Sequence, residues 1–150
     1  MGMKANSGLF HTTNGAGVEK KLGEFVQHDN TSVVWKYINA TAENYPGTVI
    51  PKSFNIITPV GVMWTHVNAT EHMYEALSSG KLYPEIKNSN PKLYAQFILY
   101  DYYQALGKAV KRGIKYETLI SSGNWEFVFS RPRRVGGNPV VKHAKFSGLK

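Results

Sequence analysis

The chain contains no cysteine among its 150 residues. A protein without cysteine forms no disulfide, has no thiolate nucleophile and builds no cysteine-based zinc site, so several classes of enzyme are excluded. The sequence also lacks the run of about 20 apolar residues that a membrane-spanning helix requires. Its first residues do not follow the charged, apolar and small-residue order of a signal peptide. We therefore expect a soluble protein with no membrane partner and no export signal of its own.

Several motifs of known enzymes are absent as well. The glycine clusters lack the GK[ST] order of a phosphate-binding loop and the GxGxxG order of a dinucleotide site. No nucleophile elbow supports a Ser/His/Asp triad. His66 and His72 are separated by six positions across an expected strand-to-helix junction, which is not the i, i+4 spacing of a zinc helix. This spacing makes a metal site at these two histidines the weaker interpretation, and we expect no metal and no cofactor.

Acidic residues are scarce near the C-terminus. Residues 111–150 hold nine Lys or Arg against only Glu117 and Glu126, whereas residues 1–110 hold nine against eight Asp or Glu. The last forty residues thus carry +7 of the formal charge of +8. A basic surface gathered on one element suits a polyanion, because each neutralised phosphate releases counterions. A solvated basic tail is the alternative interpretation.

The N-terminal half is expected to hold loops, short helices and one hairpin. The hydrophobic content of 42% suits one packed core, and we expect a single domain over residues 1–150. Residues 1–17 are expected to be loop, followed by a helix near 18–27 and another across 32–44. The segments TVIPKSFNII and VGVMWTHV around the turn TPVG predict a β-hairpin. Pro51 indicates that its first strand is an edge or a bulged strand.

Two longer helices should follow the hairpin. Asn68 as N-cap with Glu71 three residues later predicts a helix over 69–80. Asn90 as N-cap before a proline predicts a second helix over 91–112. Apolar residues recur at helical spacing and should be buried: Ala69, Met73, Ala76 and Leu77 in the first helix, and Leu93, Phe97, Ile98, Tyr102, Ala105, Leu106 and Ala109 in the second. The tyrosines between 94 and 103 are interpreted as core and helix flank.

The last third of the chain alternates with the period of a strand. KYETLI, WEFVFSR and PVVKHAKF predict a three-stranded antiparallel meander. Together with the helices this gives an α+β domain, with helices packed on one face of a small antiparallel sheet. The aromatic face of the middle strand, Trp125, Phe127 and Phe129, should pack on the longer helix.

Strand alternation then decides which polar side chains share the open face. Glu126 is expected there together with Val141, His143 and Lys145 of the last strand. The core side of that strand is expected to hold Val140, Lys142, Ala144 and Phe146. A carboxylate, an imidazole and an ammonium would thus lie on one surface.

This set of groups is sufficient to cut RNA without a metal. The ribose 2′-OH must lose a proton, the 5′-oxygen must gain one, and cations must hold the charge of the phosphorane. Glu126, His143 and a second imidazole can carry out these two proton transfers. The expected cations are Lys145 together with Arg131, Arg133 or Arg134. DNA lacks the internal nucleophile, so RNA is the favoured substrate.

His72 is the candidate for the second imidazole. A histidine in the first turn of a helix lies near exposed backbone N–H groups, which attract phosphate. The alternative is that His72 only caps or packs against its helix. His66, beside Trp64 on a strand, is interpreted as structural, and His11 is left unassigned.

Four stretches carry a resemblance to a known family: PGTVIPKSFNI, WTHVNATEHMYE, GNWEFVFSRPR and NPVVKHAKF. They resemble the C-terminal toxin domains of bacterial polymorphic toxins, the kind carried by contact-dependent inhibition systems and LXG-type secreted effectors. The resemblance covers residues 45–146, and NATEHM and PVVKHA are its most specific parts. Many such domains are similar to the barnase, EndoU, colicin and RelE (BECR) group. The chain departs from the simplest barnase-like order by placing a hairpin before its two main helices.

The resemblance implies a nuclease, usually a ribonuclease, with a BECR-like fold that displays its catalytic residues on the sheet. His72 matches the histidine of NATEHM, His143 that of PVVKHA, and Glu126 follows the tryptophan of NWEF. The domain would be delivered as part of a larger secreted or cell-surface effector and act, as a monomer, on RNA in the cytoplasm of a target bacterium. An acidic immunity protein would neutralise it in the producer. A DNase toxin, a metal-dependent nuclease and a non-catalytic nucleic-acid-binding module are the alternatives.

Overall fold

A computed structural model of the chain describes residues 30–79 and 91–147. Two compact units are distinguished, Met1–Val33 and Val34–Lys150. Apart from residues 30–33, the first four of the 3-10 helix, the features below belong to the second unit. Several expectations lie outside the described residues, namely the loop over 1–17, the helix near 18–27, the glycine that ends the first long helix and the cap of the second. The expectation of a single domain stays a prediction.

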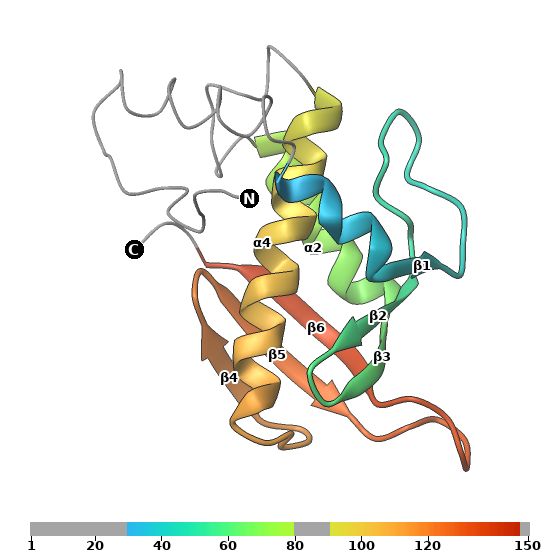
Figure 1. Cartoon of the computed structure of the whole chain (residues 1–150), viewed down its shortest axis with the longest axis vertical. Helices are drawn as coiled ribbons and strands as arrows, with labels where there is room; N and C mark the ends of the chain where they lie inside the picture. The colour runs from blue at the N-terminus through green and yellow to red at the C-terminus, as the bar shows by residue number, and fades with distance from the viewer. Residues whose placement is uncertain (1–29, 80–90, 148–150) are drawn as a thin grey trace. The chain divides into compact units, whose positions relative to one another are not determined.

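Within the described residues, six strands form one mixed sheet in the order β1-β2-β3-β6-β5-β4 (Figure 1). The strands are β1 (Ile38–Ala40), β2 (Phe54–Thr58), β3 (Gly61–Thr65), β4 (Leu119–Ser122), β5 (Trp125–Ser130) and β6 (Val140–Phe146). The helices are the 3-10 helix η1 (Asn30–Lys36), α2 (Val67–Ser79) and α4 (Pro91–Lys111). The α+β class is therefore confirmed.

The expected hairpin is present as β2 and β3, with Pro59 and Val60 in its turn. Thr58 stabilises this turn, because its hydroxyl donates to the Gly61 carbonyl at 2.6 Å and accepts from the Val60 amide at 3.2 Å. Gly61 has a φ of 124°, a conformation that side-chain-bearing residues rarely adopt. The turn residues thus fix the register of the pair.

Two expectations about the chain before this hairpin are wrong. Pro51 does not mark an edge, because β2 begins at Phe54 and pairs with β1 on one side and with β3 on the other. Pro51 forms an isolated antiparallel bridge to Asn44 outside β2, so it leaves the ladder of that strand intact. The helix expected across 32–44 ends at Lys36 and is followed by β1. Pairing with β2 decides this segment, since strand formation depends on neighbours more than on local propensity.

A short parallel contact joins the hairpin to the C-terminal strands, so the sheet is mixed and the expectation of a purely antiparallel sheet is wrong. The Trp64 amide donates to the Pro139 carbonyl at 2.9 Å, and the His66 amide donates to the Val141 carbonyl at 3.1 Å. Beyond Thr65 the chain turns into α2, while β6 continues without β3 beside it. Helix α2 packs against β6 there.

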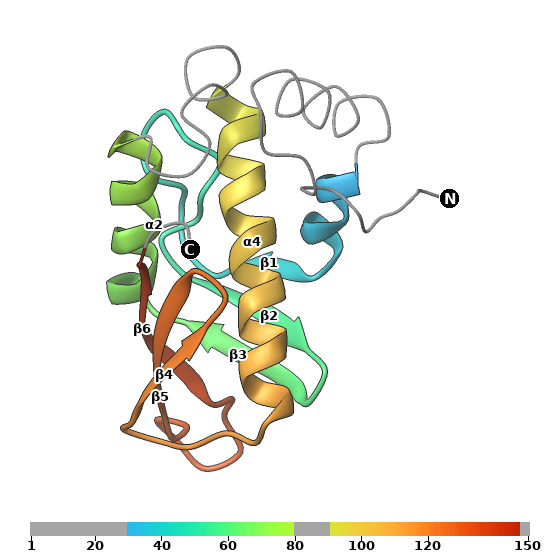
Figure 2. The same ribbon diagram turned by 90° about the vertical axis from the view of Figure 1, so that its left-hand side faces the viewer.

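Helix α4 covers the apolar face of the sheet (Figure 2). Trp125, Phe127 and Phe129 of β5 are fully buried beneath it, as expected. The buried stripe of the helix is also confirmed, with Leu93 half-buried and the rest of the set buried: Phe97, Ile98, Tyr102, Ala105, Leu106 and Ala109. The Tyr102 hydroxyl shares a buried hydrogen bond with that of Thr65 at 2.7 Å.

Asp101 on α4 directs its carboxylate to this core, where Oδ2 accepts a hydrogen bond from Trp125 Nε1 at 2.8 Å. Burial raises the pKa of Asp101, and the opposing effects of the Trp125 hydrogen bond and of the Lys108 charge are smaller. A carboxyl group whose pKa is higher in the folded state contributes stability at low pH, and this contribution is lost as the pH rises through the folded value.

We therefore expect replacement of Asp101 by asparagine to change the pH dependence of folding. The free energy of unfolding of Asp101→Asn, relative to that of the wild type, should increase as the pH rises above the ordinary carboxyl value of about 3.9, because only the wild type must ionise a buried carboxyl group. Urea unfolding at several pH values measures this difference. A difference that is the same at all pH values would contradict the expectation.

Candidate active site

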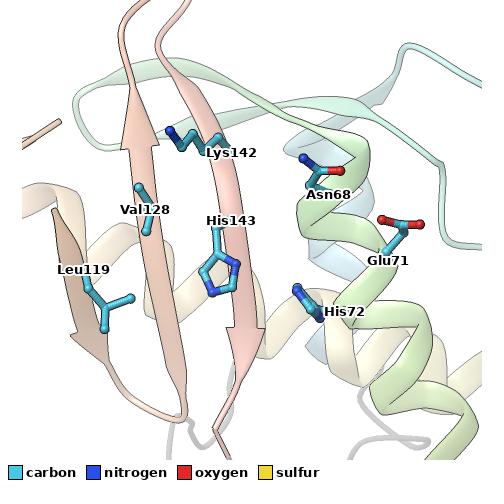
Figure 3. A pocket seen from close by; sticks show the side chains of 7 residues that line it. All are labelled: Asn68, Glu71, His72, Leu119, Val128, Lys142 and His143. Atoms are coloured by element: carbon cyan, nitrogen blue, oxygen red, sulfur yellow. The ribbon is translucent and has the colours of Figure 1, made fainter. Parts of the chain in front are cut away.

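A groove lies between the open face of the sheet and α2 (Figure 3). Its volume is about 570 Å³. The lining comes from α2 (Asn68, Glu71 and His72), from β4 and β5 (Leu119 and Val128) and from β6 (Lys142 and His143). The two histidines that the sequence analysis singled out for catalysis thus lie in one groove.

A β-bulge in β6 shapes the sheet side of this groove. Val128 pairs with His143, but the next residue of β5, Phe129, pairs with Val141, so Lys142 is an extra residue in β6. Two expectations from strict alternation are therefore wrong. Lys142 is exposed and lines the groove instead of facing the core, and Val141 is fully buried instead of lying on the open face.

Beyond the bulge the alternation is as expected. Glu126 pairs with Lys145, two residues from His143, so all three side chains lie on the open face of the sheet. Glu126 and Lys145 lie two pairs further along the strands than Val128 and His143, which line the groove. The Glu126 carboxylate is near enough for its charge to act on the pKa of His143.

The other side of the groove depends on how α2 begins. His66 caps the helix, since its Nδ1 accepts a hydrogen bond from the Asn68 amide at 3.0 Å and its carbonyl accepts from Ala69 at 2.9 Å and Thr70 at 3.2 Å. The helix begins at Val67, and the expectation that Asn68 caps it is wrong. The backbone bond from His66 to β6 ends the strand there and sets the earlier start.

His72 consequently lies in the second turn of α2, beyond the free N–H groups of the first turn, and not in the first turn as expected. It does not simply pack in the interior, because it is half-buried and lines the groove. The buried positions of the helix are Ala69, Met73 and Ala76, whereas Leu77 is half-buried.

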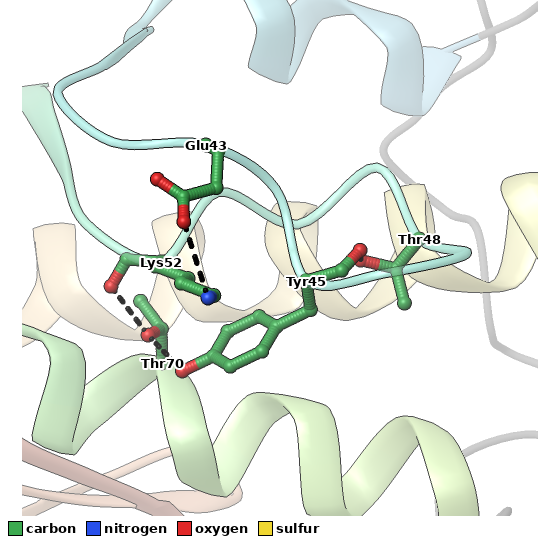
Figure 4. Close-up of polar contacts among 5 residues, drawn as sticks. All are labelled: Glu43, Tyr45, Thr48, Lys52 and Thr70. Atoms are coloured by element: carbon green, nitrogen blue, oxygen red, sulfur yellow. Dashed lines mark hydrogen bonds and ion pairs between the residues drawn. The ribbon is translucent and has the colours of Figure 1, made fainter.

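The loop between β1 and β2 holds α2 in place (Figure 4). The buried Thr70 hydroxyl donates to the Lys52 carbonyl at 2.7 Å, which leaves the Tyr45 hydroxyl to donate to Thr70 Oγ1 at 2.8 Å. The Lys52 ammonium pairs with Glu43 at 3.3 Å. Since Thr70 is two residues from His72, the hydrogen bonds of its hydroxyl to Lys52 and Tyr45 restrict the part of the helix that faces the groove. The Lys52–Glu43 pair joins two side chains of the loop to each other.

His72 and His143 are in contact, with ring centroids 5.2 Å apart and ring planes at 75°. His72 Nδ1 bonds to Glu75 Oε1 at 2.9 Å, which leaves Nε2 as the nitrogen available to a ligand. Burial lowers the pKa of His143. The charges of His72 and Lys145 act in the same direction, and the Glu126 carboxylate opposes them.

The three arginines expected to bind phosphate lie in the loop between β5 and β6. The Arg131 guanidinium stands 4.7 Å from the ring centroid of Tyr116, and that of Arg133 stands 5.3 Å from the ring centroid of Trp64. Arg134 is exposed. Because the groove lining comes from α2, β4, β5 and β6, the structure does not bring these arginines into it.

Two residues of the site were missed by the sequence analysis. Glu75 follows His72 by three positions on a helix, and this spacing is a signal that predicts contact. Lys142 had no such signal, because the bulge that exposes it depends on the pairing of β5 with β6. Lys142 also forms an ion pair with Glu117.

Over residues 30–79 and 91–147, no group of three or more His, Asp or Glu side chains is arranged to hold a metal ion. The same residues include no helix with the length and hydropathy needed to cross a membrane. No protein-family model and no curated protein matches this sequence. The chemistry of the groove is therefore the basis for a function.

Two imidazoles, one of them bonded to a carboxylate, share this groove with the side chain of Lys142. Imidazoles are the side chains best suited to take up and release protons near neutral pH. An ammonium group binds phosphate oxygens as a point charge. The arrangement suits proton transfer at a phosphodiester.

The contact between the two rings leads to a test by NMR. In the wild type, His143 should titrate below the ordinary value of about 6.5. In His72→Ala its pKa should rise, because the replacement removes both a shielding ring and a nearby positive charge. A titration of the imidazole proton signals measures both values, with Lys108→Ala as the unaffected control. A wild-type pKa at or above the ordinary value would contradict this.

Proposed function

We propose that this chain is a metal-independent ribonuclease that acts by general acid and base catalysis. The observation that carries the proposal is the contact of His72 with His143 in an open groove that Lys142 also lines. Groups that exchange protons and a cation that neutralises phosphate are what transesterification at the ribose 2′-OH requires.

The two imidazoles have different surroundings, which supports different roles for them in the proposed reaction. The lowered pKa of His143 leaves it neutral near pH 7, so it removes the proton from the 2′-OH. The 2′-oxygen then forms a bond to phosphorus while the bond from phosphorus to the 5′-oxygen breaks. His72, in its protonated form with Nδ1–H donated to Glu75, gives the proton of Nε2 to the departing 5′-oxygen. The products are a 2′,3′-cyclic phosphate and a free 5′-hydroxyl.

Glu126 has a supporting part in this proposal. It shares the open face with His143, and its negative charge stabilises the imidazolium that forms when His143 takes up the proton. Lys145, its partner across the strands, and the loop cations Arg131, Arg133 and Arg134 contribute positive potential along the path of the RNA.

The biological setting belongs to the same proposal. The stretches that resemble polymorphic toxin domains include NATEHM with His72 and PVVKHA with His143, the two residues in contact in the groove. A BECR-like toxin domain, part of a larger effector and neutralised by an acidic immunity protein, agrees with the basic C-terminal part of the chain.

The direct test is cleavage of total RNA by the full chain in excess chelator. The wild type should give fragments ending in cyclic phosphate, and His143→Ala and His72→Ala should each lower the rate by about 10²- to 10⁴-fold. Lys108→Ala, an exposed replacement on α4, serves as the control and should cleave normally. End-group analysis of the fragments identifies the chemistry.

Other outcomes of this experiment contradict the proposal in distinct ways. Binding without fragments identifies a non-catalytic nucleic-acid-binding module. Cleavage that chelator abolishes identifies a metal-dependent nuclease. Cleavage of DNA in a parallel reaction, without cleavage of RNA, identifies a DNase.

The toxin assignment has its own test in living cells. Expression of the wild type in a bacterial cytoplasm should stop growth, whereas His143→Ala at the same protein level should not. Lys108→Ala should be as toxic as the wild type. Equal growth with wild type and His143→Ala would remove the assignment.

A further inference from the structure

Of the residues that line the groove, Lys142 is the one Lys or Arg. It precedes His143 directly, and the bulge turns both side chains to the same side of β6. Figure 3 shows its ammonium group directed from β6 toward β5, on the opposite side of the histidine pair from Glu71. A phosphate at this end of the groove would meet a cation and avoid the carboxylate of α2.

The partner of Lys142 has an unusual backbone. Glu117 is, among the described residues, the one non-glycine residue with a positive φ, at 57°. Its amide donates to the Phe129 carbonyl at 2.8 Å, and the neighbouring Tyr116 forms a bridge to the same strand and lies under Arg131. The turn before β4 is thus fixed from two sides in a conformation that side-chain-bearing residues rarely adopt.

Stability does not account for this conformation. The Lys142–Glu117 pair is exposed, with side-chain exposures of 46% and 57%, and exposed ion pairs add little to the free energy of unfolding. A left-handed residue that bears a side chain costs more than such a pair returns, and strain of this kind gathers at functional sites.

We propose that Lys142 binds a phosphate of the nucleic acid in the groove and that Glu117 is the positioning residue that holds the Lys142 side chain there. An ammonium group has three donors, so the bond to Glu117 leaves two for phosphate oxygens. The proposed binding of phosphate by Lys142 rests on its position in the lining of the groove and on its pair with Glu117. The role of Lys142 in cleavage, where it neutralises charge that develops on the reacting phosphate, rests on the proposed ribonuclease function.

Binding is measured first, with a 2′-O-methyl RNA oligonucleotide that cannot be cleaved through its 2′-oxygen. Fluorescence anisotropy of the full chain at several salt concentrations gives the affinity and its salt dependence. Lys142→Ala should weaken binding by roughly tenfold and lower the slope of log K against log salt by about 0.7 to 1, the loss of one phosphate contact. Lys142→Arg should keep the slope, and Lys108→Ala should match the wild type. An unchanged slope in Lys142→Ala would overturn the binding role.

Cleavage of unmodified RNA then tests Glu117. Glu117→Gln removes a negative charge, so it should not weaken binding, yet cleavage should fall by roughly tenfold because the ion pair that holds Lys142 is lost. Glu43→Gln, which removes the same charge from the exposed Lys52 pair outside the groove, is the matched control and should cleave normally. Glu117→Gly should lose as much activity as Glu117→Gln without a lower Tm, because glycine adopts this backbone freely. Cleavage by Glu117→Gln at the wild-type rate would overturn the positioning role.

The two proposals fail in distinguishable ways. If the oligonucleotide binds through Lys142 but the wild type does not cut RNA, the phosphate site stands and the ribonuclease function falls. If the wild type cuts RNA and Lys142→Ala cuts and binds equally well, the function stands and the phosphate site falls.

Discussion

The parallel contact between β3 and β6 is the constraint on which the groove depends. Two residues of pairing contribute little stability by themselves, but the contact decides where β3 stops. The backbone of His66 makes the last of its bonds to β6, and its ring and carbonyl then cap α2. His66 thus lies directly after the end of β3 and caps the start of α2. The place of α2 against β6, and with it the meeting of His72 and His143, follows from that junction.

The two faces of the sheet have different roles: one packs against the core, and the other carries the polar side chains of the candidate site. The face toward α4 is aromatic and fully buried, and it fixes β5 and β6 in register. The opposite face carries Glu126, His143 and Lys145, where water and a ligand have access. The imidazoles come from segments far apart in the sequence, so their contact exists only in the folded chain. Partial burial of His143 is enough to lower its pKa while the ring stays accessible.

Much of this arrangement could be predicted from periodicity. The hairpin, α4 and the last three strands have clear repeats, and alternation in β5 put Glu126 on the correct face. The parallel contact could not be predicted, because pairing between distant segments leaves no local pattern. Strand β1 could not be predicted either, because it is stabilised by pairing with β2. The cap at His66 was missed because the capping box indicated Asn68, two residues later. The faces of Val141 and Lys142 in β6 were predicted wrongly, because one extra residue in a strand changes the face on which its neighbours lie.

The bulge also affects how this protein can change over evolutionary time. An extra residue in a regularly paired strand turns every later side chain to the opposite face. In β6 the shift is absorbed at Lys142, so Val141 before it and Ala144 and Phe146 after it all stay in the interior. Loss of this one residue would remove a positive charge from the lining of the groove, while the buried side chains of β6 would keep their faces. The charge of the groove is therefore independent of core packing at this position.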